Sequence, residues 1–243
     1  MAEPTAIFFM QIEKDQKTAI LLGATGLVGN ELLHQLLAHP AYGKVIALTR
    51  RPLEIKHKNL EPHVIDFDKP ETYASLLKGE DLFCALGTTM KQAGSREAFF
   101  KVDFSYTMDA ARAARKNGTA QFLLVSSVGA NAHALFFYPR VKGELENALK
   151  KLDFWALHLF RPSVLLGKRN DARAGEEITG MAMRGLDRIT GGNLLGSYRP
   201  IDAATVARGM LTAAQRLEAG IYEYPSHQIH KLAEEKQQWI TKQ

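Results

Sequence analysis

Three residues in the middle of the chain, Ser127, Tyr138 and Lys142, have side chains that could move a proton on and off a substrate oxygen. Tyr138 and Lys142 are four positions apart, so they share one face of a helix. A tyrosine has an ordinary pKa of about 10, and a nearby ammonium group favours the phenolate form. We therefore predict that Tyr138 is the acid or base, that Lys142 tunes it and that Ser127 holds the same substrate oxygen.

The Tyr138–Lys142 spacing alone is common by chance, and a lone Tyr138 could equally be a half-buried aromatic. The residues around the spacing make it more specific. Ser127 directly follows a strand-like apolar run, and Pro139 suits the first turn of a helix, where its missing N–H costs nothing. Tyr138 should therefore lie at the mouth of that helix, at the carboxyl edge of a sheet. Ligands of open α/β folds bind at that edge.

A glycine-rich turn near the start of the chain reads Gly23-Ala24-Thr25-Gly26-Leu27-Val28-Gly29. It follows a predicted strand and opens a predicted helix. Gly23 allows the tight turn, Gly26 lets the backbone approach a pyrophosphate, and Gly29 lets the helix pack close to the sheet. The free N–H groups of the helix then attract phosphate. This pattern predicts a dinucleotide cofactor, whereas the alternative is a plain strand-to-helix turn.

Two arginines after the second predicted strand indicate which dinucleotide is bound. Sites that prefer NAD place an acidic residue there, to bond the adenosine ribose. This chain has Arg50 and Arg51 instead, and arginine forms charge-assisted bonds with phosphate. We predict that Arg50, with Arg51, holds the 2′-phosphate of NADP(H), and that NAD(H) is the less favoured cofactor. Solvation at the surface is the alternative for both residues.

Two further strand ends supply the remaining candidate contacts with the cofactor. An acid after the third strand could meet the adenine amino group, although Asp68 nearby could equally cap a helix. A glycine after the fourth strand would leave room for a ribose. The predicted contacts at these ends are Asp66, Phe67, Leu86, Gly87 and Thr88.

Short apolar runs alternate with longer helical stretches, which predicts the elements that position these residues. Parallel strands buried on both faces read as such apolar runs, and right-handed crossovers make the sheet doubly wound. The expected class is therefore an α/β Rossmann fold. We expect strands over 18–22, 44–49, 63–67, 81–86, 121–126, 155–160 and 221–224, and helices over 26–38, 71–78, 97–116, 137–152, 202–217 and 227–242.

The chain reads as one domain over 18–243, preceded by an extension over 1–17. The alternating rhythm breaks after Phe160, and 167–200 is rich in glycine and charge. We expect this insertion to form a small C-terminal subdomain on the substrate side of the crevice, although it could be a decorative surface loop.

Composition excludes several other classes of protein. The net charge of +5 comes from scattered basic pairs, so no nucleic-acid partner is expected. No apolar run approaches the roughly 18 residues of a membrane span, so no membrane partner is expected either. Histidines show no metal-ligand spacing, and His158 reads as a structural residue. The single Cys84 reads as buried and inert, which fits a reducing cytoplasm. The expected partner is a small molecule of unknown identity, and a homodimer is left open.

Four motifs together resemble the short-chain dehydrogenase/reductase superfamily: 23–29, 123–127, 138–142 and 161–167. The chain resembles its atypical or extended branch, which includes nucleotide-sugar epimerases, and most of all the Tat-interacting protein family of small NADPH-binding members. The resemblance implies that Lys142 also binds the nicotinamide ribose and that Pro162 lies near the nicotinamide amide.

Two departures from the superfamily pattern keep alternatives open. Asp103 stands where many members have an asparagine that helps a proton relay, and the C-terminal part is short for a sugar-nucleotide domain. Our first hypothesis is an NADP(H)-dependent oxidoreductase acting on a small carbonyl or alcohol. The alternatives are a non-catalytic NADP(H)-binding redox sensor and an enzyme like the nucleotide-sugar epimerases or dehydratases.

Overall fold

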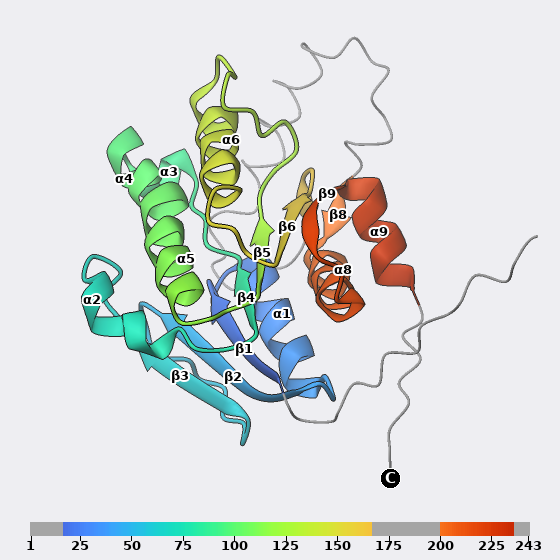
Figure 1. Ribbon diagram of the computed structural model, residues 1–243. Helices are drawn as coiled ribbons and strands as arrows, with labels where there is room; N and C mark the ends of the chain where they lie inside the picture. Colours follow the sequence, from blue (N-terminus) through green and yellow to red (C-terminus); the bar gives the residue numbers. More distant parts are fainter. Residues whose placement is uncertain (1–16, 167–199, 236–243) are drawn as a thin grey trace, which may run out of the picture.

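A parallel sheet runs through the centre of the computed structural model, which describes residues 17–166 and 200–235 (Figure 1). Its seven strands lie in the order β3-β2-β1-β4-β5-β6-β9, and every neighbouring pair is parallel. The chain starts in the middle of the sheet and winds outward in both directions, so the predicted doubly wound Rossmann fold is confirmed. The strands are β1 (Lys17–Leu22), β2 (Tyr42–Thr49), β3 (Leu60–Val64), β4 (Asp81–Cys84), β5 (Gln121–Val125), β6 (Ala156–Arg161) and β9 (Gly220–Pro225).

Helices cover both faces of this sheet (Figure 1). One face packs against α1 (Leu27–Ala38), α8 (Ala203–Arg216) and α9 (Ser226–Glu234). The other face packs against α5 (Tyr106–Lys116) and α6 (Phe137–Leu149). The short elements are α2 (Pro70–Tyr73), η1 (Ala74–Leu76), α3 (Met90–Ala93), α4 (Arg96–Phe100), the π-helix η2 (Lys101–Ser105), and a separate pair of strands, β7 (Leu165–Leu166) and β8 (Ile201–Asp202).

The two cores follow from the alternation of side chains along each strand. In β1, Ala19 and Leu21 face the α1–α8 side, whereas Ile20 and Leu22 face the α5–α6 side. All four are fully buried. A strand that must be apolar on both faces reads as the continuous apolar run that predicted it.

Several predicted elements differ from the structure in where they begin or end, and three of these differences lie between residues 60 and 116. The helix expected over 71–78 ends at Leu76, because the Asn117 side chain donates to the carbonyls of Ala74 (2.7 Å) and Leu77 (2.9 Å). The third strand begins and ends three residues early, with Pro62 inside it. That proline is tolerated because β3 lies at the edge of the sheet.

The third difference is the helix expected over 97–116, which is interrupted by the π-helical turn η2 between α4 and α5. A π turn inserts extra backbone into a helix and is often found at functional sites. Here it carries Asp103.

The seventh strand of the sheet, β9, comes after α8 in the chain. The strand predicted over 221–224 lies within β9, beside β6. The last helix, predicted over 227–242, is α9, which ends at Glu234 because Glu235 is extended. Residues 1–16 of the predicted extension over 1–17, residues 167–199 of the predicted insertion and residues 236–243 lie outside the described residues.

Candidate functional site

The glycine turn between β1 and α1 leaves no space for larger side chains. Gly23 has a φ of +84°, and a Cβ there would lie 2.5 Å from the carbonyl oxygen of Ala85. A Cβ on Gly29 would lie 2.0 Å from the carbonyl oxygen of Gly23. Geometry therefore requires glycine at both positions, since the turn is pressed against the end of β4 on one side and against α1 on the other.

The first turn of α1 keeps its N–H groups available. Gly26 is the N-cap, no side chain accepts from that turn, and the turn contains no acid. Unpaired N–H groups at a helix N-terminus attract phosphate. Ala24 and Val28 have buried side chains, so they can face a cofactor only through their backbone, whereas Thr25 is exposed and Leu27 is half-buried. The turn fits a pyrophosphate.

The two predicted phosphate-binding arginines follow the end of β2, the strand beside β1. Arg50 and Arg51 are exposed, and the described residues include no acidic partner for either. The hydroxyl of Thr49 donates to the carbonyl of Arg51 at 2.7 Å, which holds the bend. Both guanidinium groups are thus free to meet an anion.

The predicted adenine site lies just beyond β3. Asp66 is exposed, and its Oδ1 accepts from the Asp68 amide at 3.0 Å. The ring of Phe67 is buried against Tyr73 and Tyr106, so Phe67 could meet a cofactor only through its backbone.

The capping role considered for Asp68 is wrong. The N-cap of α2 is Lys69, and no side chain bonds there. Asp68 instead pairs with the Lys101 ammonium at 2.6 Å and accepts from the Tyr106 hydroxyl at 2.8 Å. These bonds lower the pKa of Asp68, with the bond from Lys101 contributing most. The acid therefore ties the end of β3 to the helix opposite.

A buried ion pair stands at the carboxyl end of β4. Lys142 Nζ lies 2.7 Å from Asp103 Oδ1, and the side chains are only 4% and 1% exposed. The amide of Thr88 donates to Asp103 Oδ2 at 2.8 Å. A Cβ on Gly87 would lie 3.8 Å from the Lys142 ammonium. The predicted loop Leu86–Thr88 therefore runs directly past the predicted catalytic lysine.

Electrostatics keep this lysine charged. Burial alone would lower the pKa of Lys142, but its interaction with the Asp103 carboxylate, and to a lesser extent with Tyr138, outweighs burial, so the pKa is raised. Tyr138 acts on Lys142 because both lie on α6, one turn apart. The buried thiol of Cys84 is the third titratable group nearby, and burial raises its pKa, which confirms the buried position predicted for it.

The predicted substrate anchor lies at the same edge. Ser127 is buried, and its hydroxyl has no hydrogen-bond partner among the described residues. The next amide, of Val128, donates to the carbonyl of Pro162 at 2.9 Å. This bond joins the ends of β5 and β6. It places Pro162, which is predicted to lie near the nicotinamide amide, close to Ser127. A buried hydroxyl without a partner is costly, and a ligand oxygen would satisfy it.

Tyr138 stands on the first turn of α6, as predicted. Its side chain is 41% exposed, and its ring packs edge-on against Phe99 at 5.7 Å between centroids. The loop from β5 reaches α6 through a bond from the Asn131 amide to the Pro139 carbonyl, 3.0 Å long. Gly143 lies against that loop, because a Cβ there would come within 2.2 Å of Asn131. The serine loop and the tyrosine helix are therefore held together.

One important contact could not be read from the sequence. Asp103 stood out only as a replacement for an asparagine, and its pairing with Lys142 depends on how η2 and α6 pack. The described residues contain no group of histidines, cysteines or acids that could hold a metal.

A family model described as NAD(P)H-binding matches residues 23–159. The chain belongs to this NAD(P)H-binding family. The rat protein named Protein HTATIP2 is 40% identical over 164 residues, which cover 66% of this chain and 67% of the relative. The Candida albicans protein named Protein FMP52, mitochondrial, is 34% identical over 206 residues, covering 82% and 88%. The predicted resemblance is confirmed.

Solved structures share the fold. MoeE5 in complex with UDP-glucose and NAD has a TM-score of 0.64 at 16% identity, covering 85% of this chain and 74% of its own. The UDP-N-acetylglucosamine 4-epimerase from Methanobrevibacter ruminantium M1, in complex with UDP-N-acetylmuramic acid, has a TM-score of 0.65 at 15% identity, covering 89% and 77%. At such identities the likeness concerns the fold alone.

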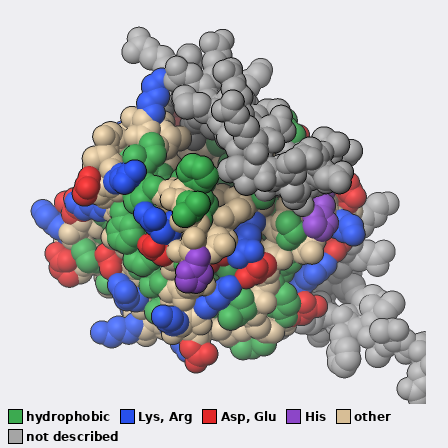
Figure 2. All heavy atoms as spheres, turned by 90° about the horizontal axis from the view of Figure 1, so that it is seen from above, with side chains coloured by type: hydrophobic (Ala, Val, Ile, Leu, Met, Phe, Trp, Pro, Cys, Tyr) green, Lys and Arg blue, Asp and Glu red, His purple; other side chains and the backbone are tan. Residues whose placement is uncertain are grey.

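The matched region of the NAD(P)H-binding family contains the glycine turn and the predicted catalytic residues, whereas Pro162 lies just beyond it. Among the described helices, none is long and apolar enough to cross a bilayer. On the face drawn in Figure 2, lysine and arginine side chains are spread among acidic and hydrophobic ones.

Proposed function

We propose that this member of the NAD(P)H-binding family is an NADP(H)-dependent oxidoreductase that acts on a small carbonyl or alcohol substrate. The observation that carries the proposal is the Ser127 hydroxyl, which is buried and has no partner among the described residues. It lies at the sheet edge that also holds the glycine turn and the Lys142 ammonium. A buried donor at the same edge as a lysine and an accessible phenol is an arrangement suited to holding one substrate oxygen.

Some residues of the chain hold the cofactor and the substrate, and Tyr138 transfers the proton. The glycine turn and the α1 N-terminus hold the pyrophosphate, Arg50 and Arg51 hold the 2′-phosphate, and Lys142 meets the nicotinamide ribose. When bound, the nicotinamide supplies or accepts a hydride at the substrate carbon. Ser127 donates a hydrogen bond to the substrate oxygen. Tyr138 gives that oxygen a proton during reduction, or takes one from it during oxidation.

Replacing the acid tests the mechanism. The Tyr138→Phe variant should lower the turnover of a carbonyl substrate by a factor of roughly 10² or more, while NADPH still binds, because the glycine turn is untouched. The substrate is first found by following NADPH consumption over a library of aldehydes and ketones. Tyr222→Phe is the matched control, since Tyr222 lies on β9, its hydroxyl donates to the Ala219 carbonyl at 2.9 Å, and the stacking of its ring on His158 is kept by phenylalanine. Full turnover by Tyr138→Phe would exclude the mechanism.

The choice of cofactor has its own test. Arg50→Ala should weaken NADPH binding roughly tenfold or more, because it removes a charge-assisted hydrogen bond, and should change NADH binding little. Titration calorimetry with both cofactors measures this. Arg208→Ala, which removes an exposed arginine of α8, should change neither affinity. Equal affinities of the unaltered protein for NADPH and NADH would contradict the assignment to NADP(H).

A non-catalytic NADP(H) sensor is the second candidate. It is favoured by Asp103, which stands where many members of the superfamily have an asparagine that helps a proton relay. Tight NADPH binding without turnover of any carbonyl or alcohol would support it. Isomerisation of a nucleotide sugar without net consumption of cofactor would support the epimerase alternative instead.

We also infer the partners and the compartment. A small molecule fits the site, and the dispersed basic side chains of Figure 2 speak against a nucleic-acid partner. A homodimer is tested by light scattering. The buried free thiol of Cys84 suits a reducing compartment, and we propose the cytoplasm. The fungal relative is named mitochondrial, so cell fractionation decides between the two.

A further inference from the structure

Two rows of side chains meet where η2 and the preceding α4 pack against α6. Phe99 and Asp103 lie one turn apart on the first helix, and Tyr138 and Lys142 lie one turn apart on the second. Phe99 packs against the Tyr138 ring with an interplanar angle of 64°, and Asp103 pairs with the Lys142 ammonium at 2.7 Å. The helix that contains the π turn therefore contacts both members of the predicted catalytic pair.

The second observation concerns the opposite charges of Asp103 and Lys142. Asp103 and Lys142 are both almost fully buried, so solvent screens their attraction little. Asp103 Oδ2 is also held by the Thr88 amide, which fixes the carboxylate from a third element. The other titratable groups that act on Lys142 are Tyr138 on α6 and Cys84 on β4. The ammonium and the carboxylate together present almost no net charge to the tyrosine.

We propose that Asp103 is a positioning residue that balances the Lys142 ammonium, so that the Tyr138 phenol keeps its proton near neutral pH and donates it to a substrate carbonyl oxygen. This inference rests on the proposed function. The O–H bond of Tyr138 breaks and a new O–H bond forms on the substrate, while the hydride that the reduced cofactor supplies reaches the carbon and the C=O π bond is lost. Water then returns a proton to the phenolate.

A titration without cofactor tests this directly. The ultraviolet absorbance of the Tyr138 phenolate is the difference between the protein and its Tyr138→Phe variant, measured at each pH. In Asp103→Asn, which keeps the shape and removes the charge, the midpoint of phenolate formation should fall by about one pH unit or more. An unchanged midpoint overturns the proposal.

A double variant separates charge from shape. Asp103→Asn combined with Lys142→Gln makes the pair neutral again, so the phenolate midpoint should return to within about half a unit of the unaltered protein. A merely structural role for Asp103 would leave the double variant at least as perturbed as the single one, which overturns the proposal. If Asp103→Asn does not fold, the unaltered protein still decides, because a phenolate midpoint near pH 7 overturns the proposal.

The pH dependence of turnover tests the role of Asp103 in the reaction itself. The rate of carbonyl reduction should fall at high pH, and Asp103→Asn should move that fall to lower pH by the same amount as the absorbance midpoint. If no carbonyl compound is reduced, the proposed function fails, whereas the absorbance titration still decides the role of Asp103. The two failures are therefore distinguishable.

Discussion

Two buried lysine–aspartate pairs stand at opposite ends of the same sheet and differ in what surrounds them. At the amino end, Lys17 Nζ lies 2.6 Å from Asp81 Oδ2. At the carboxyl end, Lys142 Nζ lies 2.7 Å from Asp103 Oδ1. Both aspartates are fully or almost fully buried, whereas the Lys17 side chain is 16% exposed and that of Lys142 is 4% exposed. The two pairs therefore have the same chemistry, and the groups around them differ.

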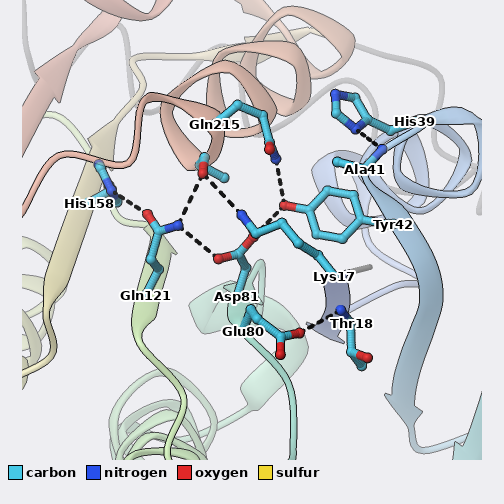
Figure 3. Close-up of polar contacts among 11 residues, drawn as sticks. Lys17, Thr18, His39, Ala41, Tyr42, Glu80, Asp81, Gln121, His158 and Gln215 are labelled. Carbon is cyan, nitrogen blue, oxygen red and sulfur yellow. Dashed lines mark hydrogen bonds and ion pairs between the residues drawn. The ribbon is translucent and has the colours of Figure 1, made fainter. Parts of the chain in front are cut away.

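The amino-end pair sits within a network of hydrogen bonds between side chains and backbone (Figure 3). Asp81 also accepts from the Tyr42 hydroxyl at 2.6 Å and from the Gln121 amide at 2.8 Å. Gln121 and Lys17 both reach the carbonyl of Ala214 in α8. These bonds join β1, β2, β4 and β5 to α8, which indicates that this end stabilises the fold.

The carboxyl-end pair shares its edge of the sheet with polar groups that have no partner among the described residues. Ser127, at the end of β5, has a buried hydroxyl of this kind, and no side chain caps the first turn of α1. The amino end is not free of unsatisfied groups either, because Gln215 Oε1, beside Tyr42, has no partner among the described residues. The two ends differ in that the amino-end aspartate is held by side chains that tie the strands to α8, whereas the carboxyl end combines the Ser127 hydroxyl with a helix N-terminus that no side chain caps. That combination, more than burial or charge, distinguishes the site.

The largest expected effect comes from breaking the amino-end network. Asp81→Ala leaves Lys17, Tyr42 and Gln121 without their shared acceptor, so the free energy of unfolding should fall by about 3–5 kcal/mol. Denaturant unfolding measures it, and the folded fraction should bind NADPH unchanged. Asp109→Ala is the control, because Asp109 forms a surface pair with Arg112 and should cost less than about 1 kcal/mol. A loss of that small size for Asp81→Ala would remove the distinction between the two ends.

A smaller effect should appear with pH through His158, which lies fully buried beside this network. Its ring nitrogens lie 3.1 Å from the Tyr224 hydroxyl and 3.3 Å from Gln121 Oε1, which confirms the structural role predicted for it. Burial lowers the pKa of His158 from 6.5 to about 4. Above pH 6.5 the ring is neutral in both states, so its contribution to stability is fully present.

As the pH falls from 6.5 towards 4, the unfolded chain takes up a proton that the folded protein refuses, so stability is lost. The loss should approach roughly 3 kcal/mol near pH 4. It is measured as the unfolding free energy of the protein minus that of His158→Asn at each pH. The subtraction removes the contribution of Asp81, whose pKa is raised by burial and which is present in both proteins. Parallel curves would show that His158 takes no part in acid sensitivity.

The same contrast explains what could be read from the sequence. The strands, the glycine turn and the Tyr138–Lys142 spacing are local patterns, because each depends on residues within one or two turns of one another. They predicted the sheet and most of the candidate site. The arginines after β2 were also visible, since strand ends converge at one edge of a parallel sheet.

Contacts between distant elements could not be predicted in this way. The pairing of Asp103 with Lys142 requires both the π turn and the packing of η2 on α6. Likewise, Glu146 accepts from Ser126 at 2.5 Å and binds Arg161 through both carboxylate oxygens, which joins α6 to the ends of β5 and β6. Nothing in the local pattern around Glu146 distinguishes it from a solvated helix residue.

The smallest expected effect compares two adjacent serines at the end of β5. Ser126 donates to the buried Glu146 carboxylate, whereas the Ser127 hydroxyl has no partner. Ser126→Ala should therefore lower the unfolding free energy by about 1–2 kcal/mol, because a charge-assisted hydrogen bond is lost. Ser127→Ala should cost nothing or stabilise the protein by up to about 1 kcal/mol, because it removes an unsatisfied buried group.

The two variants delete the same atom from neighbouring, buried positions, so each is the control for the other in denaturant unfolding. Substrate turnover sharpens the reading: Ser127→Ala should lower it although the protein is at least as stable, since the hydroxyl is reserved for a ligand. If Ser127→Ala proved the more destabilising of the two, its hydroxyl would have a partner within the protein. The Ser127 hydroxyl would then offer nothing to a ligand, and the difference between the two ends would no longer mark a site.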